Sequence, residues 1–133
     1  MWQLAEESAF TFVGKKFLVV EDTPSNRLLI QTYLSKSGAK LLFSDNGVEA
    51  LEIIEANPDI DLVIMDIRLP KLNGLMTTRE IRKRNSHLPI IAQTAFAMQS
   101  DQELCVKAGC NFFIAKPYRR SELLQAINSL IKS

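Results

Sequence analysis

Phe17-Leu-Val-Val-Glu-Asp-Thr-Pro24 is the stretch that decides the fold of this chain. Its apolar half is typical of a short buried strand. The strand is predicted to stop at the acidic pair Glu21-Asp22. Thr23 is a residue type that caps helices, and Pro24 suits the first helical position. The stretch therefore predicts a strand that leads through two carboxylates directly into a helix.

The same arrangement, a short apolar run that ends in a reactive polar residue, occurs again along the chain. The runs are Leu62–Met65 before Asp66, Pro89–Gln93 before Thr94, and Phe112–Ala115 before Lys116-Pro117. If all the runs are parallel strands of one sheet, their polar ends meet at one edge, where ligands bind in open α/β folds. The pattern thus predicts a cleft that holds carboxylates, a hydroxyl and an ammonium.

Helix-like segments alternate with these strands, which is typical of βαβ units. Glycines, prolines and helix-capping residues mark the ends of these helical segments. The segments run from Thr23-Pro24 to Ser37-Gly38, from Asn46–Glu49 to about Ala56, from the loop Arg68–Gly74 to about Asn85, from the capping box Ser100–Glu103 to Gly109, and from about Arg119 to Lys132. A further strand is predicted over Lys40–Ser44. The first helix is expected to bury Leu28, Leu29, Tyr33 and Leu34.

This order of elements predicts an α/β fold. Five β-α units with right-handed crossovers form a flavodoxin-like, doubly wound (βα)5 sandwich, with a five-stranded parallel sheet in the order 2-1-3-4-5. Residues 15–133 are predicted to form this domain. Residues 1–14 fit none of the units and are expected to be an N-terminal extension or linker.

The composition disfavours several classes of function. With 16 basic and 15 acidic residues in a chain of 133, the net charge of +1 does not favour direct nucleic-acid binding. Cys105 and Cys110 lack a zinc-binding spacing, and the single histidine, His87, is expected to be an ordinary surface residue. No apolar stretch is long enough to insert into a membrane, and the start lacks a signal-peptide pattern. We therefore expect a soluble, cytoplasmic protein.

The acidic residues of the cleft suit a divalent cation. Glu21, Asp22 and Asp66 would repel one another unless a cation or a proton relieved them, and Mg²⁺ prefers such oxygen ligands. We expect Asp22 to be the more direct ligand and Glu21 to act through water. The backbone carbonyl of Arg68, two residues past Asp66, is a further candidate ligand.

Asp66 is also a candidate nucleophile, because a carboxylate can form an acyl-phosphate when the phosphoryl charge is neutralised. Lys116 would balance the charge on the phosphoryl oxygens, as lysine does in other phosphate sites. Thr94 would donate its hydroxyl to the same group. The cleft is thus predicted to support both metal binding and phosphoryl transfer.

Together these motifs resemble the receiver domain of two-component response regulators, over about residues 15–132. The motifs are Val19–Arg27, Asp45–Leu51, Ile64–Pro70 with Gly74, Thr94-Ala95 and Lys116-Pro117. Asn26-Arg27 and Thr94–Met98 are most similar to the receivers of hybrid sensor histidine kinases. The chain would then be either a segment of such a kinase or a stand-alone receiver.

The resemblance implies a phosphoacceptor switch in two-component or phosphorelay signal transduction, which assists its own phosphorylation and dephosphorylation. Asp66 would accept a phosphoryl group from a histidine kinase or a histidine-phosphotransfer protein with Mg²⁺ bound, and Thr94 and Lys116 would bind that group. Phe113 matches the family's switch aromatic, and the Lys116-Pro117 peptide is expected to be cis. Phosphorylation would alter a partner-binding face on a protein that is a monomer or a weak dimer.

The chain departs from the family's pattern at Arg68, two residues after Asp66, and at Phe96, two residues after Thr94. The resemblance implies that these two positions tune how fast the phosphoryl group is lost. We predict that bulky Phe96 shields the aspartyl phosphate from water. Phe96→Ala should then accelerate dephosphorylation, and an unchanged rate would refute the idea.

The sequence leaves one alternative open, namely a receiver-like interaction module that signals without phosphate, and a metal titration would distinguish the two. A flavodoxin-type enzyme is disfavoured because Glu21-Asp22 would repel a flavin phosphate. An aspartate-based phosphatase is disfavoured because Arg68 stands where a second acidic residue is expected.

Overall fold

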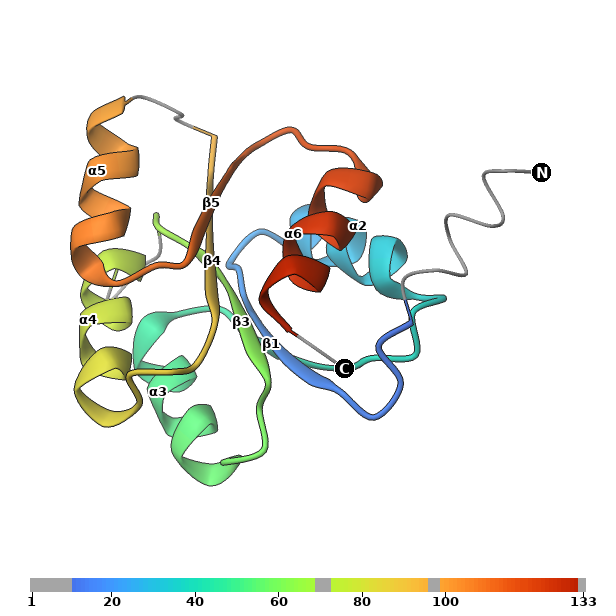
Figure 1. Ribbon diagram of the computed structural model, residues 1–133, viewed down its shortest axis with the longest axis horizontal. Coiled ribbons are helices and arrows are strands. Elements are labelled where there is room, and N and C mark those ends of the chain that lie inside the picture. The colour runs from blue at the N-terminus through green and yellow to red at the C-terminus, as the bar shows by residue number, and fades with distance from the viewer. Residues whose placement is uncertain (1–10, 69–72, 96–98, 132–133) are drawn as a thin grey trace.

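The computed structural model describes residues 11–68, 73–95 and 99–131, which form a parallel sheet with helices on both faces (Figure 1). The strands are β1 (Lys16–Val20), β2 (Lys40–Ser44), β3 (Leu62–Asp66), β4 (Ile90–Thr94) and β5 (Phe112–Ala115). They pair in the order β2-β1-β3-β4-β5, and every pair is parallel. The predicted α/β fold and its strand order are confirmed.

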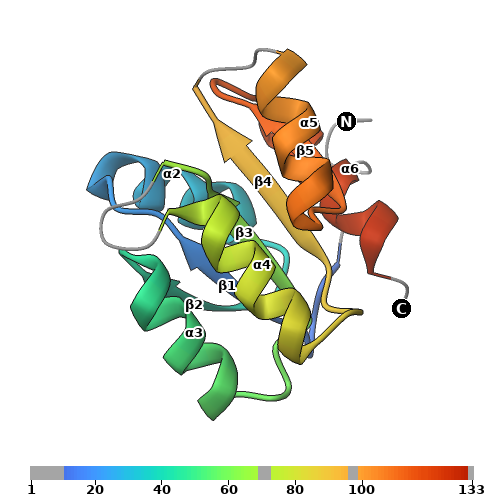
Figure 2. The same ribbon diagram turned by 90° about the vertical axis from the view of Figure 1, so that its left-hand side faces the viewer.

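The helices lie in two layers. They are α2 (Pro24–Leu34), α3 (Gly47–Ala56), α4 (Gly74–Arg84), α5 (Gln99–Ala108) and α6 (Arg120–Leu130). α2 and α6 cover one face of the sheet, whereas α3, α4 and α5 cover the other (Figures 1 and 2). From β1 the chain runs first to β2 on one side and then crosses to β3 on the other side of β1. The switch point of the topology therefore lies between β1 and β3.

The central strands are buried on both faces because successive side chains of a strand point to opposite sides. Phe17 and Val19 of β1 pack towards α2 and α6, and Leu18 and Val20 pack towards α3 and α4, all without exposed area. Such strands are expected to be nearly continuous apolar runs. The same burial explains why a polar residue that follows an apolar run marks the carboxyl end of a strand.

The phase of α2 differs from the prediction. Leu34 is buried as predicted, and Ile30, four residues before it on the same face of the helix, is buried with it. Leu28 and Leu29 are 63% and 41% exposed, so the expectation that they lie inside was wrong. The helix also ends at Leu34, earlier than the predicted stop at Ser37-Gly38.

The helix caps explain where α3 and α4 begin. Asn46 accepts a hydrogen bond from the backbone N–H of Glu49 at 2.8 Å, as the capping spacing predicted. Asn73 caps α4 in the same way through the N–H of Met76 at 2.9 Å. The predicted capping box at Ser100 was wrong, because α5 already begins at Gln99.

The packed core extends further towards the N-terminus than the strands do. Phe12, which the sequence placed in the N-terminal extension, is only 2% exposed and packs edge-on against Phe17, with ring centroids 5.6 Å apart. Residues 1–10 lie outside the described residues, so the extension itself stays a prediction. His87 is exposed, as expected. None of the helices in the described part of the chain has the length and apolar character of a bilayer-spanning segment.

Candidate functional site

The register of the sheet brings the predicted site residues to one edge. Val20 pairs with Met65, so Glu21 and Asp66 follow in step at the ends of β1 and β3. Asp66 in turn pairs with Gln93 of β4. Since paired residues of parallel strands point to the same face, these three side chains converge beside the switch point. The carboxyl end of the sheet therefore carries a polar row.

Three carboxylates gather at this edge. Oxygen atoms of Glu21, Asp22 and Asp66 all lie within 4.8 Å of one another. Glu21 is completely buried and Asp66 is 6% exposed, whereas Asp22 is exposed. The structure thus brings together the acidic residues that the sequence singled out, with one of them open to solvent.

Lys116 joins the two buried carboxylates. Its Nζ lies 2.8 Å from Glu21 Oε1 and 2.9 Å from Asp66 Oδ2. Burial on its own lowers the pKa of the ammonium, but the hydrogen bonds and negative charges of Glu21 and Asp66 outweigh it, so the pKa of Lys116 is raised overall. Lys116 is therefore charged at neutral pH and is the internal counter-charge of the cluster.

Glu21 is held on several sides. Its Oε2 accepts a hydrogen bond from the backbone N–H of Thr23 at 3.1 Å, and its Oε1 accepts one from Gln93 Nε2 at 3.3 Å. Its backbone carbonyl accepts a hydrogen bond from Arg27 Nε at 2.7 Å. Thr23, which occupies the N-cap position of α2, makes no side-chain cap. The turn after β1 is thus organised around the Glu21 carboxylate.

Asp66 is oriented by the loop that follows it. Its Oδ1 accepts a hydrogen bond from the backbone N–H of Arg68 at 2.9 Å, which keeps the start of that loop beside the carboxylate. Gly74 lies against the same segment. A Cβ at Gly74 would lie 2.6 Å from Ile67 Cα, so only glycine lets α4 begin this close to the end of β3.

Thr94 and Phe113 lie on the neighbouring strands. Thr94 is 1% exposed at the end of β4, and its backbone carbonyl accepts a hydrogen bond from the N–H of Lys116 at 2.8 Å. Phe113 is half-buried and packs against the small apolar cluster formed by Ile67, Ala92 and Cys105. The Lys116-Pro117 peptide is cis, as the resemblance implied. Phe96 lies outside the described residues, so its shielding role stays a prediction.

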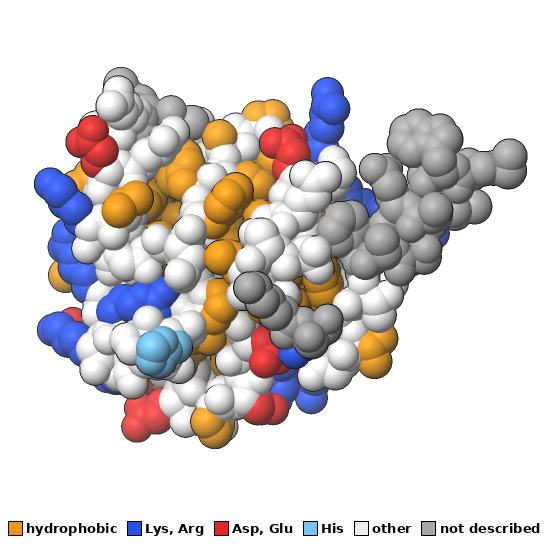
Figure 3. Space-filling view, in the orientation of Figure 1, with side chains coloured by type: hydrophobic (Ala, Val, Ile, Leu, Met, Phe, Trp, Pro, Cys, Tyr) orange, Lys and Arg blue, Asp and Glu red, His pale blue; other side chains and the backbone are white. Residues whose placement is uncertain are grey.

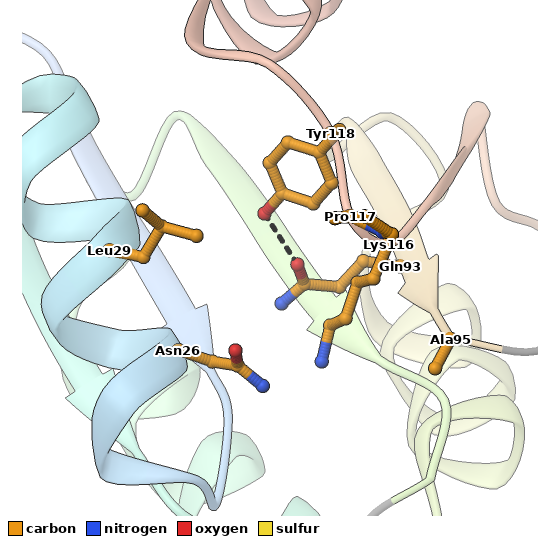
Figure 4. Close-up of a pocket in the computed structure, with 7 residues that line it drawn as sticks. All are labelled: Asn26, Leu29, Gln93, Ala95, Lys116, Pro117 and Tyr118. Carbon is orange, nitrogen blue, oxygen red and sulfur yellow. Dashed lines mark hydrogen bonds between the residues drawn. The ribbon is translucent and has the colours of Figure 1, made fainter.

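A pocket of about 320 Å³ opens beside this cluster (Figure 4). Asn26 and Leu29 of α2 form one side, and the other side is formed by the segment from Lys116 to Tyr118 that follows β5 (Figure 4). The side chain of Gln93 lies between these two sides (Figure 4). The exposed position of Leu29, which the sequence analysis had placed inside, is explained by its place in this wall.

Gln93 and Tyr118 are site-linked residues that sequence reasoning missed. The Tyr118 hydroxyl donates a hydrogen bond to Gln93 Oε1 at 2.6 Å, and both side chains are buried. The available signal was a glutamine at the end of an otherwise apolar strand, since a buried amide needs partners. Nothing in the spacing pointed to Tyr118 as that partner.

The sequence matches the response regulator receiver domain family over residues 17–128. The chain belongs to this family. It is 36% identical to the polar-differentiation response regulator DivK of Brucella anthropi, over 88% of this chain and 96% of that protein. It is also 39% identical to the sensor histidine kinase GacS of Pseudomonas protegens, over 91% of this chain but only 14% of that protein's length.

Among solved structures, the receiver domain of the sensor histidine kinase PA1611 from Pseudomonas aeruginosa is similar with a TM-score of 0.84 and 39% identity, over 91% of this chain and 100% of that domain. That domain has a magnesium ion coordinated in its active site cleft. The chain is thus a receiver domain of two-component signalling, and it has the fold of the solved receiver domain of PA1611.

Proposed function

We propose that Asp66 accepts a phosphoryl group from a phosphohistidine partner in a Mg²⁺-dependent reaction, and that the phosphorylated domain switches a partner-binding face. The observation that carries the proposal is the cluster of Glu21, Asp22 and Asp66 with Lys116 placed between two of them. Three carboxylates and one ammonium leave a net negative site that a hard divalent cation would complete.

The residues present fit Mg²⁺, because every side-chain donor is a carboxylate oxygen and Asp22 is open to solvent. Asp22, Asp66 and the backbone carbonyl of Arg68 would hold the ion, and the enclosed Glu21 would act through water. When bound, Mg²⁺ would neutralise the phosphoryl oxygens and so favour attack by a carboxylate.

The residues of the chain supply the remaining parts of the transfer. A carboxylate oxygen of Asp66 forms the new O–P bond while the N–P bond to the donor imidazole breaks and the imidazole leaves. Lys116, already within hydrogen-bond distance of Asp66, would pair with the phosphoryl oxygens. Thr94, at the end of the adjoining strand, would donate its hydroxyl to the same group.

Phosphorylation replaces the single negative charge of the Asp66 carboxylate with a phosphoryl group that carries about two, which gives Thr94 and Lys116 a new anionic partner. Phe113, half-buried on β5 beside Ala92 of β4, would repack as the end of β4 moves. The surface formed by α5, β5 and α6 would then change. Apolar side chains run down the middle of this face (Figure 3), and Phe112 on it is 43% exposed.

The phosphodonor is proposed to dock on α2, next to the pocket. Leu28 is 63% exposed there and Leu29 lies in the pocket wall, so the helix presents apolar surface beside the phosphoacceptor. A histidine kinase or a histidine-phosphotransfer protein presents its phosphohistidine on a helical bundle, which suits such a face. Leu28→Glu should therefore slow phosphotransfer from a phosphorylated histidine-phosphotransfer domain far more than it slows labelling by acetyl phosphate.

The test of phosphorylation uses acetyl phosphate with Mg²⁺ and the intact mass of the protein. The wild-type chain should gain one phosphoryl group, and Asp66→Asn should gain none. Asp59→Asn is the matched control, because Asp59 lies at the opposite end of the sheet. There its Oδ2 forms an ion pair with Lys16 Nζ at 2.7 Å. A wild-type chain without the gain, or an Asp66→Asn chain that keeps it, would reject the proposal. EDTA should abolish the gain.

A further inference from the structure

Behind the acidic cluster, a buried chain of hydrogen bonds connects Glu21 to the segment after β5. Gln93 Nε2 donates to Glu21 Oε1 at 3.3 Å. The Tyr118 hydroxyl in turn donates to Gln93 Oε1 at 2.6 Å, the bond drawn in Figure 4. The phosphoryl-transfer roles proposed above use neither Gln93 nor Tyr118. Both residues nonetheless lie in the wall of the pocket beside Lys116.

The direction of this chain is determined by chemistry. An ionised Glu21 can only accept hydrogen bonds, so Gln93 must turn its NH₂ group towards Glu21 and its carbonyl towards Tyr118. The carbonyl accepts, so Tyr118 must donate. Burial, followed by the negative charge of Glu21, raises the pKa of the Tyr118 hydroxyl, which therefore keeps the proton that it donates.

Each residue of this hydrogen-bond chain is also fixed by burial or by a further hydrogen bond. Tyr118 is 7% exposed, and its backbone carbonyl accepts a hydrogen bond from the Tyr33 hydroxyl of α2 at 2.9 Å. Gln93 has no exposed area and lies near the carboxyl end of β4, which is flanked by β3 and β5. Since Lys116 binds the same oxygen of Glu21 that Gln93 binds, Gln93 helps to fix the position of that carboxylate relative to Lys116 and Asp66.

We infer that Gln93 and Tyr118 are positioning residues of the metal site, which hold the Glu21 carboxylate in the orientation that Mg²⁺ binding needs. This inference rests on the proposed Mg²⁺-dependent function. Gln93 acts on Glu21 directly, and Tyr118 acts only through Gln93. Residues that orient a metal ligand or its bound water in this way contribute to metal affinity although they do not touch the metal.

The test measures the Kd for Mg²⁺ by isothermal titration calorimetry of the full chain, prepared free of metal and titrated with MgCl₂. Gln93→Met keeps the length of the side chain but removes its amide, and it should weaken Mg²⁺ binding about tenfold or more. Tyr118→Phe removes one hydroxyl and should weaken binding about threefold. The double variant should match Gln93→Met, because Tyr118 has no other route to Glu21 in the proposed chain.

Ile90→Val is the matched control, because Ile90 is equally buried in β4 but packs on the opposite face of the sheet, against α3 and α4. It should lower stability and leave the Kd unchanged. An Ile90→Val chain with the same loss of affinity would reduce the effect to general destabilisation and overturn the inference. If Gln93→Met does not fold, Tyr118→Phe decides alone, and a wild-type Kd for that variant refutes the inference.

The remaining outcomes separate this inference from the proposed function. A wild-type chain that does not bind Mg²⁺ overturns the proposed function, and the inference with it. A wild-type chain that binds, together with a Gln93→Met chain that binds equally well, overturns the inference alone. A double variant that loses the product of the two single effects overturns the series arrangement, because it would show that Tyr118 acts independently of Gln93.

Discussion

Replacing Lys116 by methionine removes the only positive charge that contacts both buried carboxylates, among the ion pairs seen in the described residues. Removing one partner of a buried ion pair typically costs about 3–5 kcal/mol, because it leaves the other charge without compensation. Here the cost should fall at the lower end, about 3 kcal/mol, because each carboxylate keeps other donors. Glu21 keeps Thr23 and Gln93, and Asp66 keeps the N–H of Arg68.

The assay is urea unfolding followed by far-UV circular dichroism at pH 7, first in EDTA and then with Mg²⁺. In EDTA the free energy of unfolding of Lys116→Met should lie about 3 kcal/mol below that of the wild type. Added Mg²⁺ should stabilise the variant more than the wild type, since the divalent cation replaces the missing charge and binds only the folded state. Lys36→Met, at an exposed position, is the control and should change the free energy by less than about 0.5 kcal/mol.

Two results would refute this reasoning. A Lys116→Met chain within about 1 kcal/mol of the wild type in EDTA would mean that the ammonium does not compensate the buried carboxylates. An equal Mg²⁺ stabilisation of variant and wild type would mean that the ion and Lys116 do not serve the same charges. The first result concerns the folded cluster, and the second concerns the proposed metal site.

Further predictions concern local structure around the site. Gly74→Ala should cost about 1–3 kcal/mol in unfolding free energy, because its Cβ would lie 2.6 Å from Ile67 Cα, and a neutral urea midpoint would contradict that contact. Asn73→Ala should cost about 1 kcal/mol through loss of the α4 cap, whereas Asn73→Ser should retain most of it. Burial raises the pKa of Cys105 to about 12 and also raises the pKa of half-buried Cys110. Both thiols should therefore react with Ellman's reagent at pH 8 more than about tenfold more slowly in the folded chain than in urea, and equal rates would contradict the raised pKa values.

Much of the fold could be read from local patterns. The strand that ends at Val20, the acidic pair after it and the helix that begins at Pro24 lie where the sequence predicts them. Each depends on side-chain periodicity or on a turn residue, which act within a few residues of the chain. Asn46 caps α3 for the same reason.

The details that failed depend on contacts between distant segments. The side of α2 that faces the core was mispredicted at Leu28 and Leu29, because an apolar residue does not show whether it meets the sheet or the wall of a pocket. Phe12 was assigned to the N-terminal extension from the sequence, whereas in the structure its ring packs against Phe17. Neither outcome is encoded in local spacing, since both result from the way α2 and the N-terminal segment pack on the sheet.

The types of residue around the cluster were apparent from the sequence alone, because a polar side chain that follows a buried parallel strand must emerge at the same edge as its neighbours. Glu21, Asp66, Thr94 and Lys116 were predicted on that basis, and they lie at that edge. What only the tertiary structure decided is how they are held. The pairing of Gln93 with Tyr118, 25 residues away, depends on the register of β4 against β3 and on the path of the chain after β5, and hydrogen-bond geometry of this kind exists only once the strands are paired.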